Sequence, residues 1–161
     1  MITLANNPAR ILAPVETLNC FDTQSANMGR ALTPLQAWNL AIEDPQPLLK
    51  LAFRLRDAVS TRFGVKAIGG FSRQSHEAVA VGQRLDFFLV EHTDETALVL
   101  TERDRHLDVM TCISTEGARV TITSSVKVHN WFGHVYMLPA GIARGIIVRR
   151  MLRRLAKKTG A

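Results

Sequence analysis

The sequence predicts a single α+β domain in which a curved antiparallel β-sheet, a meander, wraps on a long C-terminal helix. Two shorter helices are expected after the first strand. An alternating pattern rich in Val, Ile, Thr and Phe from residue 84 to 129 predicts the sheet, and helical spacing after residue 130 predicts the long helix. With 161 residues, 47% of them apolar, the chain has the size of one domain covering residues 1–161.

The distribution of charge and the two cysteines indicate which kind of protein to expect. Seven of the 20 basic residues and no acidic residue lie in residues 141–161, so the remaining 13 basic and 14 acidic residues leave the rest of the chain at −1. The two cysteines, Cys20 and Cys112, lack zinc-site spacing, and we expect reduced structural thiols. The sequence shows neither a membrane-spanning run nor the pattern of a secretory signal. We therefore expect a cytoplasmic protein with no cofactor.

The N-terminal part of the chain predicts one strand and two helices. The strand is expected around residues 15–21. Thr33 and Pro34 are typical of a helix cap and first turn, and Asp44 and Pro45 repeat this signal for a longer helix. Residues at helical spacing follow each start: Ala37, Trp38, Ala41 and Ile42 in the first helix, and Leu48, Ala52, Leu55, Val59 and Phe63 in the second.

Turn-forming pairs punctuate the predicted meander at residues 94–95, 103–104 and 116–117. Two-residue turns at these places predict the pairs Leu89 with Leu100, Leu100 with Leu107, and Ile113 with Val120. All three turns then assign the same apolar residues to one face: Leu85, Phe87, Leu89, Leu98, Leu100, Leu107, Val109, Ile113, Ile122, Val126 and Val128. Because a one-residue slip would send every side chain to the other face, this agreement predicts the face that the C-terminal helix covers.

The opposite face carries the candidate catalytic residues. His106 and Asp108 point the same way from one strand, about 7 Å apart, with Asp104 at the end of the sheet. A carboxylate can orient a histidine for acid–base catalysis, and the Asp-x-His-x-Asp spacing also suits metal ligands. The alternative is a solvated face whose opposed polar pairs align the strands. We expect no metal, because no second source of ligands accompanies the three residues.

The C-terminal segment predicts a long amphipathic helix. Asn130 can cap it, and Pro139 either begins or kinks a helix that runs to about Lys158. One side is basic, and the other carries Ile147, Val148, Met151, Leu152 and Leu155. We expect a solvated basic face and no nucleic-acid partner, because no aromatic residues accompany the arginines. Contact with a membrane surface ranks below the solvated face, because the apolar side is needed to cover the sheet.

Several short motifs in the second half of the chain resemble a known family. They are Asp104-Arg105-His106-Leu107-Asp108, Val126-Lys127-Val128-His129-Asn130, the residues Gly133, Tyr136 and Pro139, and Ile147-Val148-Arg149-Arg150-Met151-Leu152. They resemble a bacterial family of domains of unknown function that occurs alone or appended to NAD(P)-binding reductase-like proteins. That family is similar to the helix-grip superfamily of START domains, polyketide cyclases and plant allergens. The resemblance implies a curved sheet gripping a C-terminal helix, often with a cavity between them.

Three hypotheses about function follow. The leading one is a small-molecule-binding protein whose cavity between sheet and C-terminal helix holds an apolar or amphipathic ligand. The expected lining residues are Phe87, Leu89, Leu100, Leu107 and Val126, with Arg105 as the polar anchor. The second is a cyclase or hydrolase that uses His106 with Asp104 or Asp108. The third is a homodimeric interaction module whose apolar patch consists of Phe88, Val90 and Val99.

Overall fold

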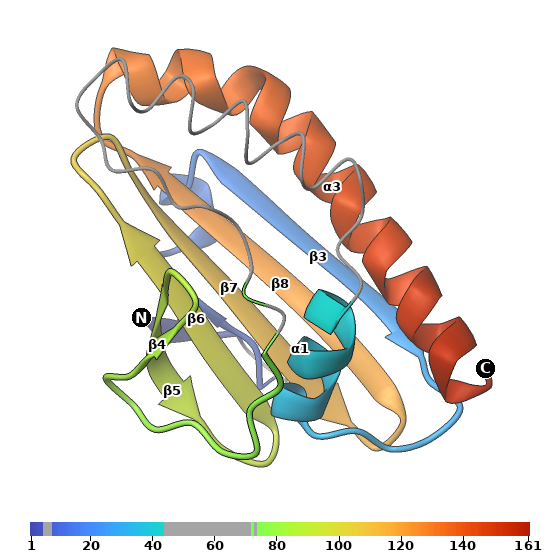
Figure 1. Cartoon of the computed structure of the whole chain (residues 1–161). Helices are drawn as coiled ribbons and strands as arrows, with labels where there is room; N and C mark the ends of the chain where they lie inside the picture. The colour runs from blue at the N-terminus through green and yellow to red at the C-terminus, as the bar shows by residue number, and fades with distance from the viewer. Residues whose placement is uncertain (5–7, 44–71, 73) are drawn as a thin grey trace.

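A six-stranded antiparallel sheet and a long C-terminal helix dominate the fold (Figure 1). The computed structural model describes residues 1–4, 8–43, 72 and 74–161. The strands, in the order β3-β8-β7-β6-β5-β4, are β3 (Cys20–Asn27), β8 (Arg119–Val128), β7 (Leu107–Glu116), β6 (Ala97–Arg103), β5 (Phe88–Thr93) and β4 (Arg84–Leu85). Consecutive strands from β4 to β8 are neighbours, so the predicted α+β class and its meander are confirmed. In the described part of the chain the sheet stays open between β3 and β4.

The first helix matches its prediction closely. α1 (Pro34–Glu43) starts with a capping box, in which the Gln36 N–H donates to Thr33 Oγ1 (3.2 Å) and the Thr33 N–H donates to Gln36 Oε1 (3.0 Å). Ala37, Trp38 and Ile42 are buried against the sheet, as the helical spacing predicts. The helix predicted from Pro45 to Phe63 lies outside the described residues.

The predicted first strand is displaced. η1 (Val15–Thr17), a 3₁₀ turn, occupies the start of the predicted range, and β3 begins only at Cys20. Pro14 precedes this turn with its carbonyl accepting a hydrogen bond from Thr17 Oγ1 (2.8 Å). Proline lacks an N–H for a strand ladder, so the chain turns here before it can pair with β8.

A small N-terminal hairpin covers the outer face of the sheet. Its strands are β1 (Ile2–Thr3) and β2 (Arg10–Ile11). Leu4, Ala9 and Leu12 pack with Val99, Met110 and Cys112 on this face. Val99 is 0% exposed, so it cannot belong to a surface patch for a second subunit. The sequence misses this cover because a two-strand hairpin with few apolar residues has a weak local signal.

The long helix α3 (Trp131–Thr159) runs through Pro139 without ending and packs on β3, β8 and α1 (Figure 1). Asn130 caps its first turn, as predicted. Val148, Leu152 and Leu155 are buried in the main core, and Arg149, Arg150, Arg153, Arg154, Lys157 and Lys158 are exposed. The predicted apolar and basic sides of this helix are therefore confirmed.

The pairing of β6, β7 and β8 differs from the prediction by even numbers of residues. Ile113 pairs with Ile122 instead of Val120, and Leu100 pairs with Thr111 instead of Leu107. The β6–β7 turn lies further along the chain than the predicted residues 103–104. The Asp104 carboxylate stabilises it there, because its Oδ1 accepts hydrogen bonds from the N–H groups of His106 (2.6 Å) and Leu107 (2.9 Å). Since even shifts keep side chains on the same face, the predicted apolar face survives across these three strands.

A β-bulge reverses the faces of β5. Leu89 pairs with Thr101 and Val90 with Leu100, and the register shifts between Val90 and His92. Val90 is therefore 0% exposed in the main core, whereas Leu89 lies on the other face. The prediction that Leu89 opposes Leu100 on the helix-covered face is wrong, because the extra residue of a bulge reverses the alternation of side chains.

The same reversal applies to Phe88, the first residue of β5. Phe88 pairs with Leu85 in the register of β4 and β5, and its ring meets Trp38 edge-on with centroids 5.8 Å apart. Phe88 therefore packs with the main core, and the ring of Phe87 lies against it with centroids 4.3 Å apart. Together with the burial of Val90 and Val99, this removes the apolar surface patch that the homodimer hypothesis required.

The third turn lies further along the chain than the predicted residues 94–95, since Thr93 pairs with Leu98 instead of Thr96. The Asp94 N–H donates to the Ala97 carbonyl (2.9 Å), and Asp94 Oδ1 accepts from the N–H groups of Thr96 and Ala97. Burial raises the pKa of Asp94, but hydrogen bonds from His92, Thr96 and Ala97 outweigh it and hold that pKa well below its ordinary value. The turn is thus built around an ionised carboxylate.

Candidate functional site

His106, the predicted catalytic histidine, joins the β6–β7 turn to the start of α3. Its Nε2 accepts a hydrogen bond from Arg105 Nε (3.0 Å), and its Nδ1 lies against the Asn130 amide, 2.9 Å from Nδ2 and 3.2 Å from Oδ1. Asn130 Oδ1 accepts from the Gly133 N–H (3.0 Å), and its Nδ2 donates to the Arg105 carbonyl (3.2 Å). This arrangement gives the His106 side chain a positioning part in the fold.

Asn130→Ala is expected to lower the free energy of unfolding by about 2 kcal/mol, because it removes a helix cap together with hydrogen bonds to the β6–β7 turn. Asn130→Asp is the matched control, since a carboxylate can still accept from the Gly133 N–H and suits a helix N-terminus. Urea denaturation of both variants measures the difference. Equal losses of stability in the two variants would contradict this role of the Asn130 oxygen.

The two predicted catalytic carboxylates have other partners. Asp104 caps the turn through the backbone of His106 and Leu107. Asp108 Oδ1 lies 3.1 Å from His129 Nε2, and Asp108 Oδ2 lies 3.9 Å from the Arg103 guanidinium. The structure therefore distributes Asp104, His106 and Asp108 over separate interactions around the turn. Within the described residues, no three or more His, Cys, Asp or Glu side chains gather as a metal site.

The predicted lining residues divide into two groups. Leu100, Leu107 and Val126 lie on the face of the sheet toward α3 and are buried, as predicted. Leu89 does not share that face, because the β-bulge turns it to the other side, and Phe87 lies in the turn between β4 and β5 with its ring against that of Phe88 (centroids 4.3 Å apart). Arg105 is exposed in the β6–β7 turn and bonds to the ring of His106, so it is not placed as the anchor of a ligand beneath α3.

A row of polar side chains crosses the helix-facing side of the sheet. Asp22 on β3 pairs with Ser124 on β8, and Ser124 pairs with Thr111 on β7. We call Asp22, Ser124 and Thr111 the polar row. The polar row ends at β7, because the residue that pairs with Thr111 on β6 is Leu100, which belongs to the aliphatic core. Polar groups on three neighbouring strands thus share one layer with the core of the protein.

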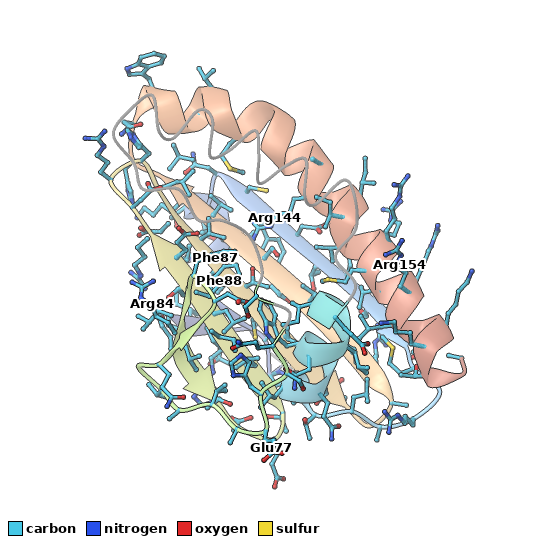
Figure 2. The ribbon with its side chains drawn as sticks, viewed as in Figure 1. Glu77, Arg84, Phe87, Phe88, Arg144 and Arg154 are labelled. Carbon is cyan, nitrogen blue, oxygen red and sulfur yellow. The ribbon has the colours of Figure 1, made fainter. Side chains whose placement is uncertain are left out.

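Arg144 reaches the polar row from α3. Its guanidinium donates to Thr111 Oγ1 (3.2 Å), and Figure 2 shows the side chain between α3 and the sheet. One residue further along the helix, the Gly145 carbonyl accepts from Gln24 Nε2 (3.1 Å), and the same amide donates to Asp22 Oδ2 (2.7 Å). The Arg144 cation and the Asp22 carboxylate therefore both lie in the layer between α3 and the sheet. Each is hydrogen-bonded to a neutral side chain, Thr111 for Arg144 and Gln24 for Asp22.

The sequence analysis did not select this group, although it contains a usable signal. Arg144 is a charged residue in the otherwise uncharged stretch from Trp131 to Val148. Asp22 and Gln24 alternate with Phe21 and Thr23 in a strand whose pairing partner lies about a hundred residues away. Only the pairing of β3 with β8 brings Asp22 and Arg144 to the same layer, and local periodicity does not encode that pairing.

Comparison with known proteins gives a family for the chain. Among the described residues, no helix combines the length and the apolar character needed to cross a membrane. The searches of curated proteins and of solved structures found no match. A family model described as "Protein of unknown function (DUF2867)" matches residues 15–151, which include every strand of the main sheet and most of α3. The chain therefore belongs to the DUF2867 family.

Proposed function

We propose that this protein binds a small amphipathic molecule with an acidic group in the layer between the sheet and α3. The observation that supports it is the Arg144 guanidinium, which comes from α3 to the polar row inside an otherwise aliphatic layer. A guanidinium offers several donors in one plane and holds a carboxylate or phosphate in a fixed orientation. Arg144 takes the role of anchor that the sequence analysis assigned to Arg105.

The surroundings of Arg144 suit both ends of such a ligand. Asp22, Thr111 and Arg144 are half-buried, so solvent still reaches part of the group. Leu100, Leu107 and Val126 on the same face provide aliphatic surface next to these polar groups. Binding sites for small molecules commonly combine an apolar wall with a few polar groups that fix orientation.

The solvation that a charged group loses on burial also supports a role for Arg144 beyond packing. Charged groups lose solvation when a helix covers them, and a methionine of similar length would fill the same space without that cost. The C-terminal half of α3 shows the alternative, because Val148 and Leu152 cover the sheet there with aliphatic side chains. An arginine at this position brings hydrogen-bond donors into the layer, which an aliphatic side chain cannot do, and these donors suit a ligand's acidic group.

The resemblance to helix-grip proteins favours the same class of function. Proteins of that superfamily hold lipids, hormones or polyketides between a curved sheet and a C-terminal helix. This chain has a six-stranded antiparallel sheet against a long C-terminal helix. Because one fold serves many functions, the resemblance supports the location of the ligand, and the Arg144 group supports its chemistry.

Decanoate and decanol provide a matched pair of probes. They have the same alkyl chain and differ in the carboxylate. We expect decanoate to bind at one saturable site and decanol to bind more weakly, as measured by isothermal titration calorimetry. Arg144→Met is expected to weaken decanoate binding by about tenfold to a hundredfold, the range for a hydrogen bond to a charged group, and to leave decanol unchanged.

Arg149→Met is the control, because it makes the same chemical change at an exposed position of the same helix. It should leave decanoate binding unchanged. Native mass spectrometry of the purified protein independently reports any small molecule that remains bound. Absence of saturable decanoate binding, or equal effects of the two methionine variants, would overturn the assignment of Arg144.

A further inference from the structure

The outward face of α3 exposes large apolar residues in its first half. Trp131 is 75% exposed, Val135 56% and Ile146 44%. Successive residues of an α-helix are about 100° apart around the axis, so these three side chains lie within about 60° of one another. We call these three exposed side chains, which lie in one angular sector of the helix, the apolar strip.

The same face is basic in the second half of the helix. Arg149 and Arg153 fall within the same angular sector as the apolar strip, with Arg150 and Lys157 beside them, and all four are exposed. The whole of α3 contains seven Lys and Arg residues and no Asp or Glu. One neighbouring acid, Glu43, pairs with Lys158 (2.8 Å) at the end of the helix. The outward face thus combines exposed aromatic and aliphatic groups with a concentrated positive charge.

From this combination we propose that α3 docks on an anionic lipid surface through its outward face. The first half of the helix inserts Trp131, Val135 and Ile146 among the lipid headgroups, and the basic residues of the second half lie over the negative charge. Helices that lie in a membrane interface combine these two features, with tryptophan at the level of the headgroups. The inward face stays on the sheet, because Val148, Leu152 and Leu155 are buried in the core.

A lipid surface fits this face better than nucleic acid does. Phosphate recognition by a basic helix uses cations and polar donors, and an exposed tryptophan with two aliphatic residues would stay in water beside a duplex. At a bilayer those three side chains leave water, which adds a favourable apolar contribution to the attraction of the cations. The exposed Trp131 is also a direct reporter of that transfer.

The test uses the full chain with phosphatidylcholine vesicles, with and without phosphatidylglycerol. We expect the protein to sediment with the anionic vesicles only and to release on addition of salt. Binding should shift the emission of Trp131 to shorter wavelength, whereas Trp38, which is buried in the core, contributes a constant background. Trp131→Phe should remove the spectral shift while part of the sedimentation remains.

A charge-neutral triple variant, Arg149→Gln with Arg153→Gln and Lys157→Gln, tests the basic half. Each cation near an anionic surface contributes about fivefold to binding, so the triple variant should bind about a hundredfold more weakly. Arg84→Gln with Arg119→Gln and Lys127→Gln is the matched control, since it removes the same charge from exposed residues outside α3. Equal weakening by both triples, no binding to anionic vesicles at low salt, or binding to a DNA duplex in place of vesicles would each overturn the proposal.

Discussion

Val90→Asp is expected to lower the free energy of unfolding by about 4 kcal/mol, because it places a carboxyl group in the aliphatic core. Val90 is 0% exposed and belongs to the same core cluster as Leu98, Leu100 and Leu152. The new carboxyl group would have to take up a proton or lose its hydration, and either change favours the unfolded chain. Urea denaturation measures the loss through the midpoint of unfolding.

Leu89→Asp is the matched control for this prediction and is expected to cost only about 1 kcal/mol. Leu89 is half-buried on the other face of β5, opposite Thr101. The uninterrupted alternation of the sequence predicts the reverse order, with Leu89 in the core, so the two variants test the β-bulge directly. A larger loss for Leu89→Asp than for Val90→Asp would show that β5 follows the simple alternation.

Gly133→Ala is expected to destabilise the protein by about 3 kcal/mol, at the upper end for added volume in a packed site. A Cβ atom at Gly133 would lie 2.6 Å from Val128 Cγ1 and 2.7 Å from the His106 carbonyl oxygen. That carbonyl accepts a hydrogen bond from the His129 N–H (2.8 Å), so moving it away breaks a contact at the end of β8. The first turn of α3 would therefore have to separate from the sheet.

Gly141→Ala, two helical turns further along, is the control and should stabilise the protein by about 0.5–1 kcal/mol, because alanine restricts the unfolded chain and favours a helix. A Cβ atom at Gly141 would meet only Met137 Cε at 4.0 Å, an ordinary contact. Opposite signs for the two variants in urea denaturation are the expected result. A stabilising Gly133→Ala would show that α3 begins further from the β6–β7 turn.

These contacts connect the turn around His106 to the proposed ligand site. The turn and Asn130 fix where α3 begins, and Gly133 lets the helix approach the sheet closely. Arg144 follows about three turns later, so its position over Thr111 depends on that start. The residues that the sequence suggested as catalytic therefore contribute to the geometry of the Arg144 group.

Much of the architecture follows from local signals in the sequence. Thr33 and Asn130 cap α1 and α3 as predicted, because a capping side chain bonds to backbone groups within the next few residues. The alternation of apolar residues likewise identifies the face of β6, β7 and β8 that the helices cover. Family membership agrees with the motifs noted around residues 104–108 and 126–130.

The site depends on contacts that no local pattern specifies. The polar row requires β3 to pair with β8, and Arg144 then has to reach Thr111, 33 residues earlier in the chain. In the same way, the cover of the outer face requires the N-terminal hairpin to pack on Val99 and Cys112. Such placements result from the packing of distant segments, so sequence patterns identify the residues without assembling them.

Local signals thus specify the α+β class, the capped helices and the face of the meander that the helices cover, because caps and periodicity act over a few residues. Long-range packing specifies the shifts of register, the reversal of β5 by its bulge and the proximity of Asp22, Thr111 and Arg144. When the pairing register of a strand shifts by an even number of residues, each side chain stays on the same face of the sheet. A single extra residue in a bulge sends the following side chains to the other face. Packing against the rest of the protein selects which of these arrangements forms.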